Sequence, residues 1–106
     1  MASSKEYLNF ILEQLSDLEN ISSLSMMGEF IIYYQGKIVG GIYDNRLLVK
    51  ATHSAKEYMS DVHYEVPYKG AKEMILVENV DDKAFLTGLF EKMYDELPHP
   101  KVKKKK

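Results

Sequence analysis

The sequence predicts an α+β domain in which an antiparallel sheet of about five strands is covered by N- and C-terminal helices. Residues 29–50 contain three short runs rich in β-branched and aromatic residues, as strands prefer. Gln35-Gly36 and Asp44-Asn45 separate these runs, and such residues tolerate the positive φ of tight hairpins. The flanking segments carry apolar residues at helical spacing. The predicted order is α-β-β-β-α-β-β-α, in two layers.

The composition restricts the class of protein. A chain of 106 residues suits one domain, and we expect a folded part over residues 1–98 and a disordered lysine-rich tail over residues 99–106. The absence of cysteine excludes disulfides, thiolate zinc sites, iron–sulfur clusters and cysteine nucleophiles. No apolar run approaches the ~20 residues of a membrane-spanning helix, and no signal peptide begins the chain. We therefore expect a cytoplasmic protein without membrane contact.

The first helix is predicted over residues 4–18. Ser3 and Glu6 have the spacing of a capping box, which satisfies backbone donors at a helix start. An apolar stripe follows at helical intervals, consisting of Leu8, Ile11, Leu12, Leu15 and Leu18. Residues 20–25 are predicted as a polar connection interrupted by Ile21 and Leu24.

Shorter elements follow the three-strand meander. Ser54 and Glu57 also have capping-box spacing, which predicts a short helix that begins near Ala55. Residues 64–68 alternate like a fourth strand, but Pro67 lacks an N–H, so this strand should be short, irregular or at a sheet edge. The apolar run over residues 74–77 predicts a buried strand.

The last helix is predicted from about Asp82 to Glu96. Asp81 is the expected N-cap, and Pro98 and Pro100 should end the helix. Its inner stripe is formed by Leu86, Leu89, Phe90, Met93 and Leu97.

The charge distribution is asymmetric. The whole chain has a net charge of −2, and residues 101–106 contribute five positive charges, so residues 1–100 carry −7. An acidic body repels phosphate backbones, which argues against direct duplex binding by the folded part. The tail lysines could associate with nucleic acid or could only keep the chain soluble: Lys101, Lys103, Lys104, Lys105 and Lys106.

No catalytic, cofactor or metal site is predicted. Gly36, Gly40 and Gly41 do not have phosphate-loop spacing, and the Gly40-Gly41 pair is interpreted as a bulge or a close approach within a strand. Glu29 and Asp44 could act as a carboxylate pair only if a cleft perturbed their pKa values.

The histidines and loop serines show no catalytic or metal-binding pattern. His53, His63 and His99 lack the spacing of a helical metal site, and no nucleophile elbow surrounds Ser22, Ser23 and Ser25. We expect surface, turn or capping roles for these residues.

The chain is rich in tyrosine, which is common at protein interfaces because it combines apolar area with a hydroxyl group. The candidate interface residues are Tyr33, Tyr34, Tyr43 and Leu48. Tyr33 and Tyr34 are adjacent and should point to opposite faces of a strand. Ordinary packing within the sheet is the alternative explanation for the tyrosines.

Several segments resemble the TfoX N-terminal domain family, also called TfoX/Sxy-like. These are the methionine-rich entry at 26–30, the glycine-lysine turn at 34–38, and the strand at 41–50 with its Leu-Leu-Val-Lys end. The Val-Pro-Tyr segment at 66–68, residues 74–78 and the Phe85-x-x-x-Leu89-Phe90 helix are similar as well. The resemblance covers about residues 5–97 and implies an antiparallel sheet with flanking helices, similar to the secretion-chaperone-like fold.

The resemblance also implies a functional class. Full-length members of the competence-regulator branch are transcriptional co-regulators with a second helical domain, and the family supplies no catalytic residues. We therefore expect a non-enzymatic protein-interaction module with a protein partner, such as a transcription factor, or with a second copy of itself. The alternatives are weak nucleic-acid association through the basic tail, and a small ligand-binding protein or enzyme.

Overall fold

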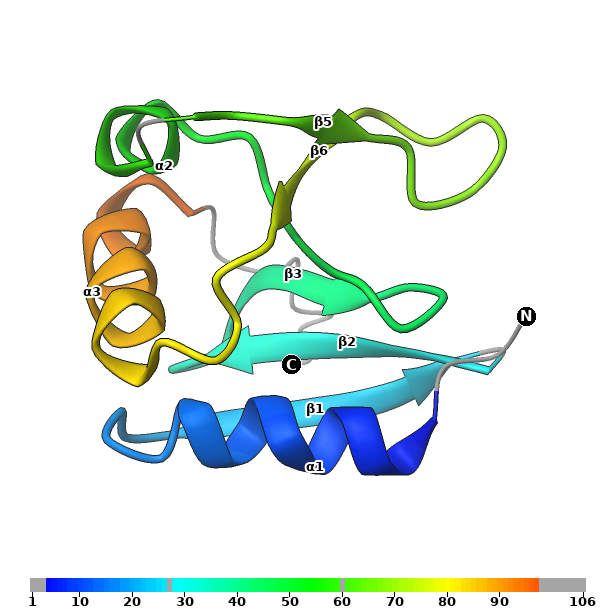
Figure 1. Cartoon of the computed structure of the whole chain (residues 1–106), viewed down its shortest axis with the longest axis horizontal. Helices are drawn as coiled ribbons and strands as arrows, with labels where there is room; N and C mark the ends of the chain where they lie inside the picture. Colours follow the sequence, from blue (N-terminus) through cyan, green and yellow to red (C-terminus); the bar gives the residue numbers. More distant parts are fainter. Residues whose placement is uncertain (1–3, 27, 60, 98–106) are drawn as a thin grey trace, which may run out of the picture.

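The sheet contains six strands in the order β1-β2-β3-β4-β6-β5, and every neighbouring pair is antiparallel. The computed structural model describes residues 4–26, 28–59 and 61–97 (Figure 1). The strands are β1 (Ile21–Met26), β2 (Glu29–Tyr34), β3 (Lys37–Ile42), β4 (Leu47–Val49), β5 (Tyr64–Glu65) and β6 (Met74–Val77). The helices are α1 (Lys5–Gln14), α2 (His53–Tyr58), α3 (Lys83–Met93) and the short 3₁₀ helix η1 (Tyr94–Glu96).

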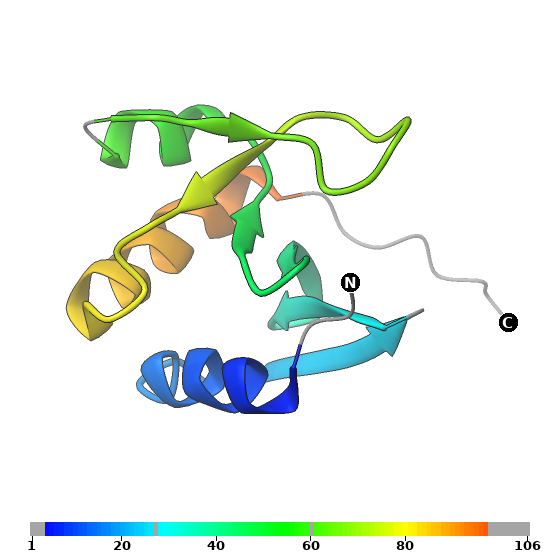
Figure 2. The same cartoon turned by 45° about the vertical axis from the view of Figure 1, so that its right-hand side comes forward.

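Helices α1 and α3 cover one face of this sheet (Figures 1 and 2). One core cluster joins both helices to the sheet. It contains Leu8 and Ile11 of α1, the Leu15 C-cap, Leu86, Leu89, Phe90 and Met93 of α3, and Phe30, Ile32, Tyr34, Val39, Ile42, Leu47, Val49, Ile75 and Val77 of the sheet. This arrangement confirms the predicted α+β class and the apolar stripes of both long helices. α2 packs against α3, where the Tyr58 and Phe85 rings are 5.2 Å apart.

Both predicted hairpin turns are present between the predicted strands. Gln35 and Gly36 have φ values of 50° and 84°, and Asp44 and Asn45 have φ values of 54° and 56°. Positive φ at both central residues is typical of the type I′ turn, whose twist matches that of the flanking strands. The turn chemistry therefore fixes the register of the β2–β3 and β3–β4 hairpins.

Gly40 and Gly41 lie where strand β3 approaches its neighbours too closely for a side chain. A Cβ atom on Gly40 would lie 2.0 Å from the Leu48 carbonyl oxygen, and one on Gly41 would lie 2.6 Å from the Phe30 carbonyl oxygen. The register between β2 and β3 also shifts next to Ile32, as at a β-bulge. The structural interpretation of this glycine pair is confirmed.

Strand β1 corrects one prediction. Residues 20–25 were expected to form a polar connection, yet Ile21–Met26 pair with the whole of β2 without a register shift. Serine-rich segments have little strand preference of their own. Pairing with β2 therefore determines this conformation, and the sheet has six strands where about five were expected.

The helix boundaries differ from the predictions by a few residues. α1 ends at Gln14 instead of residue 18, and α3 ends at Met93 before η1 continues to Glu96. The N-caps are Ser4, Thr52 and Asp82, each of which accepts a hydrogen bond from the backbone N–H three residues later at 3.1 Å. The predicted caps Ser54 and Asp81 do not fill this role, and Ser3 lies outside the described residues. The short, edge position predicted for the strand near Pro67 is confirmed by β5.

Lys37 is buried although it carries a charge, with 7% of its surface exposed. Its Nζ donates a hydrogen bond to the Tyr94 carbonyl oxygen at 3.1 Å and lies 4.0 Å from the centre of the Tyr94 ring. A cation at the C-terminal end of a helix is stabilised by the negative end of the helix dipole, and the aromatic face adds attraction. The lysine of the glycine-lysine turn therefore fastens β3 to the end of α3.

Replacing Gly40 by alanine should strongly destabilise the domain, because the new methyl group meets backbone rather than a movable side chain. We expect a loss of about 3 kcal/mol in the free energy of unfolding, as for severe overpacking. Urea unfolding followed by circular dichroism measures this value. Gly36→Asn is the control, because its turn position is open and asparagine tolerates positive φ. A Gly40→Ala variant as stable as the control would contradict the close approach.

Replacing Lys37 by methionine should lower the free energy of unfolding by about 1 to 2 kcal/mol, because a charge-assisted hydrogen bond and a cation–π contact are lost. The cost is limited because the Leu97 N–H also donates to the Tyr94 carbonyl, at 3.2 Å. Denaturant titration measures the change, and Lys56→Met on the exposed side of α2 serves as the matched control. Equal stability of the two variants would show that the contact contributes nothing.

Candidate interaction surface on the outer face of the sheet

The face of the sheet opposite α1 and α3 is called the outer face. In β2, Phe30, Ile32 and Tyr34 point into the core, so the intervening Ile31 and Tyr33 point to the outer face. The strand registers place further side chains on the same face. Its apolar residues are Leu24, Met26, Ile31, Tyr33, Ile38, Tyr43, Leu48, Met74 and Leu76. Half-exposed apolar side chains on an open sheet face are a candidate binding surface.

An open groove of about 650 Å³ crosses this face, and we call it the outer groove. Its apolar floor is formed by Ile31, Ile38 and Gly40, and its rim carries Lys50, Thr52, Lys72 and Glu73. The remaining lining residues are Tyr43, Ala51, Pro67, Tyr68, Ala71 and Met74. Five of the lining residues belong to the long connection between β5 and β6, whose course Figure 1 shows, so this connection forms one wall of the groove.

Two tyrosines stand at the groove where this connection meets the β3–β4 hairpin. The Tyr43 and Tyr68 rings are 6.2 Å apart and tilted by 56°, a favourable aromatic arrangement. The Tyr43 ring also lies over Gly41, where only a glycine leaves room for it. Tyr68 is 63% exposed and presents its ring to solvent. The pair offers one anchored and one accessible aromatic surface.

The pKa of Tyr43 is raised above its ordinary value of 10.0, first by burial and then by the nearby Tyr68 and Glu29. The hydroxyl group therefore stays protonated at neutral pH and can donate a hydrogen bond. It is not available as a base or as a nucleophilic phenolate under these conditions. This chemistry suits recognition of a ligand or partner.

An ion pair links the β3–β4 turn to β5 beside the groove. Arg46 pairs with Glu65 of β5, and its Nε donates to the Tyr43 carbonyl oxygen at 3.2 Å. Both charged side chains are about one-third exposed, at 32% and 37%. The pair connects the β3–β4 hairpin to β5, and so fixes the position at which the groove wall begins.

The structure separates the four candidate interface residues. Tyr33 and Tyr43 are half-buried on the outer face, in the position that an interface would need. Tyr34 is only 7% exposed, because it packs in the core against Phe90 and Tyr94 at ring distances of 6.4 and 5.4 Å. Leu48 is fully buried although it belongs to the outer face. Tyr34 and Leu48 thus pack within this chain, as the alternative of ordinary sheet packing expects, and a partner interface at the other two residues stays a prediction.

The sequence did not single out the residues that complete the groove. Ile31 and Ile38 could have been found, because they alternate with core residues in the same way as Tyr33. Pro67 and Tyr68 could not, because their place depends on how the β5–β6 connection folds back over the sheet.

Glu29 and Asp44 lie close together, but the arrangement is structural. A carboxylate oxygen of Glu29 accepts a hydrogen bond from the Asp44 backbone N–H at 3.1 Å, which holds the hairpin turn. Neither residue lines the outer groove. His53 and His63 are exposed and contact Glu57 and Asp61 at 2.9 and 3.3 Å, in agreement with surface roles.

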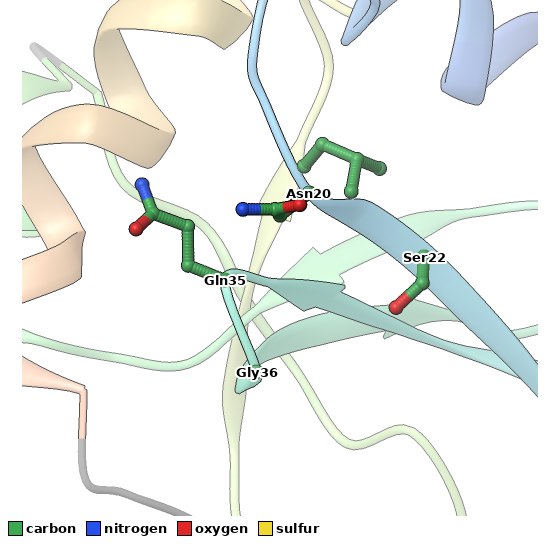
Figure 3. Close-up of a pocket in the computed structure, with 5 residues that line it drawn as sticks. Asn20, Ser22, Gln35 and Gly36 are labelled. Carbon is green, nitrogen blue, oxygen red and sulfur yellow. The ribbon is translucent and has the colours of Figure 1, made fainter.

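A second, smaller pocket lies at the end of the sheet where β1 begins and β2 ends (Figure 3). It is lined by Asn20, Ile21, Ser22, Gln35 and Gly36, and the Gln35 N–H donates to the Asn20 carbonyl oxygen at 2.9 Å. Asn20 and Gln35 have positive φ values of 62° and 50°. The pocket lining contains no titratable side chain, so it can offer hydrogen bonds but no acid–base chemistry.

Two classes of site are not found in the part of the chain that the structure describes. Within residues 4–26, 28–59 and 61–97, no three histidine or acidic side chains come together as potential metal ligands. None of the described helices combines the length and the apolarity that crossing a membrane requires. Lys101, Lys103, Lys104, Lys105 and Lys106, as well as His99, lie outside the described residues, so the association of the tail with nucleic acid stays a prediction.

Comparison with known proteins agrees with the resemblance seen in the sequence. The TfoX N-terminal domain matches residues 13–87. A protein of Spirochaeta aurantia, described as an uncharacterized 12.7 kDa protein in the trpE 5′ region, is 31% identical over 107 residues, which covers 100% of this chain and 93% of that protein. No solved structure matches the chain. The chain therefore belongs to the TfoX N-terminal domain family.

Proposed function

We propose that this domain is a non-enzymatic protein-interaction module that binds its partner through the outer groove. The observation that carries the proposal is the combination of an apolar floor, an aromatic pair and a charged rim in one open groove. Interfaces commonly have this anatomy, with aromatic residues in an apolar centre and polar residues around it. On the resemblance to the competence-regulator branch, the partner that we propose is a transcription factor.

Tyr68 is the expected centre of binding. Its ring is exposed, while the contact with Tyr43 limits its motion before a partner arrives. A preordered aromatic side chain loses little conformational freedom on binding, and tyrosine is frequent among the residues that dominate interface energy. Lys50, Lys72 and Glu73 at the rim supply charges that can select the orientation of the partner.

A small apolar ligand is the second candidate occupant of the outer groove. A volume of about 650 Å³ falls within the range of pockets that hold small molecules. The groove is open along the sheet, however, which favours an extended or convex protein surface over a fully enclosed ligand. Affinity purification separates the two functions, because only the first predicts a protein that co-purifies with the domain.

Tyr68→Ala should weaken binding of the partner to the outer groove. We expect at least a tenfold weaker affinity, equivalent to about 1.4 kcal/mol, because truncation deletes the exposed ring. The measurement is affinity purification from the native host with mass-spectrometric identification, followed by titration of the purified partner. Circular dichroism checks that the variant remains folded.

Tyr64→Ala is the matched control for this experiment. Tyr64 is also an exposed tyrosine, at 46%, but it does not line the groove. Retention of the same partners by both variants would refute binding through the outer groove. Loss of the same partners from both variants would point to a surface on β5 instead.

A further inference from the structure

Strand β1 forms an edge of the sheet that carries none of the usual protection against pairing. It is six residues long, Ile-Ser-Ser-Leu-Ser-Met, and contains no charge and no proline. Its pairing with β2 has no bulge, and residues 22–26 are all exposed. Edge strands normally avoid association by charged residues, proline, bulges or short length. Among the described strands, only β2 pairs with β1.

The direction of the free backbone groups on β1 follows from one hydrogen bond. The Asn20 carbonyl accepts from the Gln35 N–H at 2.9 Å, so it points toward β2. Because this peptide bond is trans, the Ile21 N–H points away from β2. Alternation along the strand then directs the N–H and C=O groups of Ile21, Ser23 and Ser25 outward. These groups are positioned to pair with another antiparallel strand.

The other edge of the sheet cannot serve as the complementary surface. β5 has two residues, Tyr64 and Glu65, and Pro67 follows closely and has no N–H to donate. The Glu65 side chain forms an ion pair with Arg46. Head-to-tail association of β1 with β5 of a second copy would therefore find little backbone to bond. Pairing of β1 with β1 forms a closed two-fold dimer whose outer edges are the two short β5 strands.

We propose that two copies of this chain associate through antiparallel β1–β1 pairing, with Leu24 of each copy opposite Leu24 of the other. A two-fold axis perpendicular to the sheet requires that paired residues share a face, and this register satisfies that condition. It pairs Ser23 with Ser25, whose backbone groups point outward, and it places Met26 opposite Ser22. The half-exposed Leu24 and Met26 side chains, at 50% and 47%, gain apolar neighbours on the outer face.

A second copy fits this edge better than a charged segment would. An uncharged strand creates no like-charge repulsion with itself, although the acidic body of the chain opposes close approach of two copies. Added salt should therefore strengthen the dimer by screening that repulsion. The proposal does not depend on the outer groove, since the pairing uses backbone groups at the sheet edge.

Cysteine cross-linking tests the register, because the chain has no cysteine of its own. Leu24→Cys should form a disulfide-linked dimer under mild oxidation. Directly opposed residues have Cβ atoms about 4.5–5.5 Å apart, and those of a non-hydrogen-bonded pair lie at the short end of this range, near the spacing that a disulfide needs. Ser16→Cys on the exposed surface after α1 measures cross-linking by random collision. Cross-linking of Leu24→Cys no faster than Ser16→Cys would overturn the proposed register.

Sedimentation at several protein concentrations tests the dimer itself. The full chain should show a concentration-dependent monomer–dimer equilibrium, and Leu24→Lys should raise the dissociation constant at least tenfold, because two lysines would oppose each other across the axis. Ser16→Lys is the matched control and should dimerise like the unchanged chain. A strict monomer at every concentration, or equal association of both lysine variants, would overturn the proposal.

Discussion

The whole structure depends on one-sided burial of the sheet. α1 and α3 remove the centre of one face from water, where Ile32, Ile42, Val49 and Ile75 have 0% exposure. Burial of apolar area is the main favourable term in folding, and a chain of this length has only one core in which to obtain it. The opposite face receives no helix, so its apolar residues other than the buried Leu48 stay at least partly exposed and available for another purpose.

The shape of the outer face follows from β3. Its two glycines let β4 and Phe30 approach closely, and the bulge next to Ile32 increases the local twist of the strand. The absence of a side chain at Gly41 also creates the space in which the Tyr43 ring lies. The same residues that permit tight strand packing therefore shape the outer groove, which is why the glycine pair is important without contributing any chemistry of its own.

Local chemistry explains which features could be predicted from the sequence. The Gln35-Gly36 and Asp44-Asn45 turns were predictable, because their conformations depend on the residues that adopt them. Helix caps were less predictable, since serine, threonine and aspartate compete at neighbouring positions and only the structure selects Thr52 over Ser54. Strand β1 takes its conformation from pairing with the neighbouring β2, which its own serine-rich sequence does not encode. The burial of Leu48 depends on segments distant in the sequence, such as β6, where Leu76 is its partner.

The two surfaces that we propose for association have the same origin: the fold has too few elements to cover them. Covering the second face would need another helix, and capping the β1 edge would need another strand or charged residues, none of which the described part of the chain provides. These uncovered surfaces are where the chain can still lower its free energy by binding. Because the groove lies across the middle of the outer face and β1 lies at its margin, pairing through β1 would place two outer faces side by side without covering either groove. A dimer formed in this way would present two binding sites on one continuous sheet, and a partner that is itself two-fold symmetric would gain from engaging both.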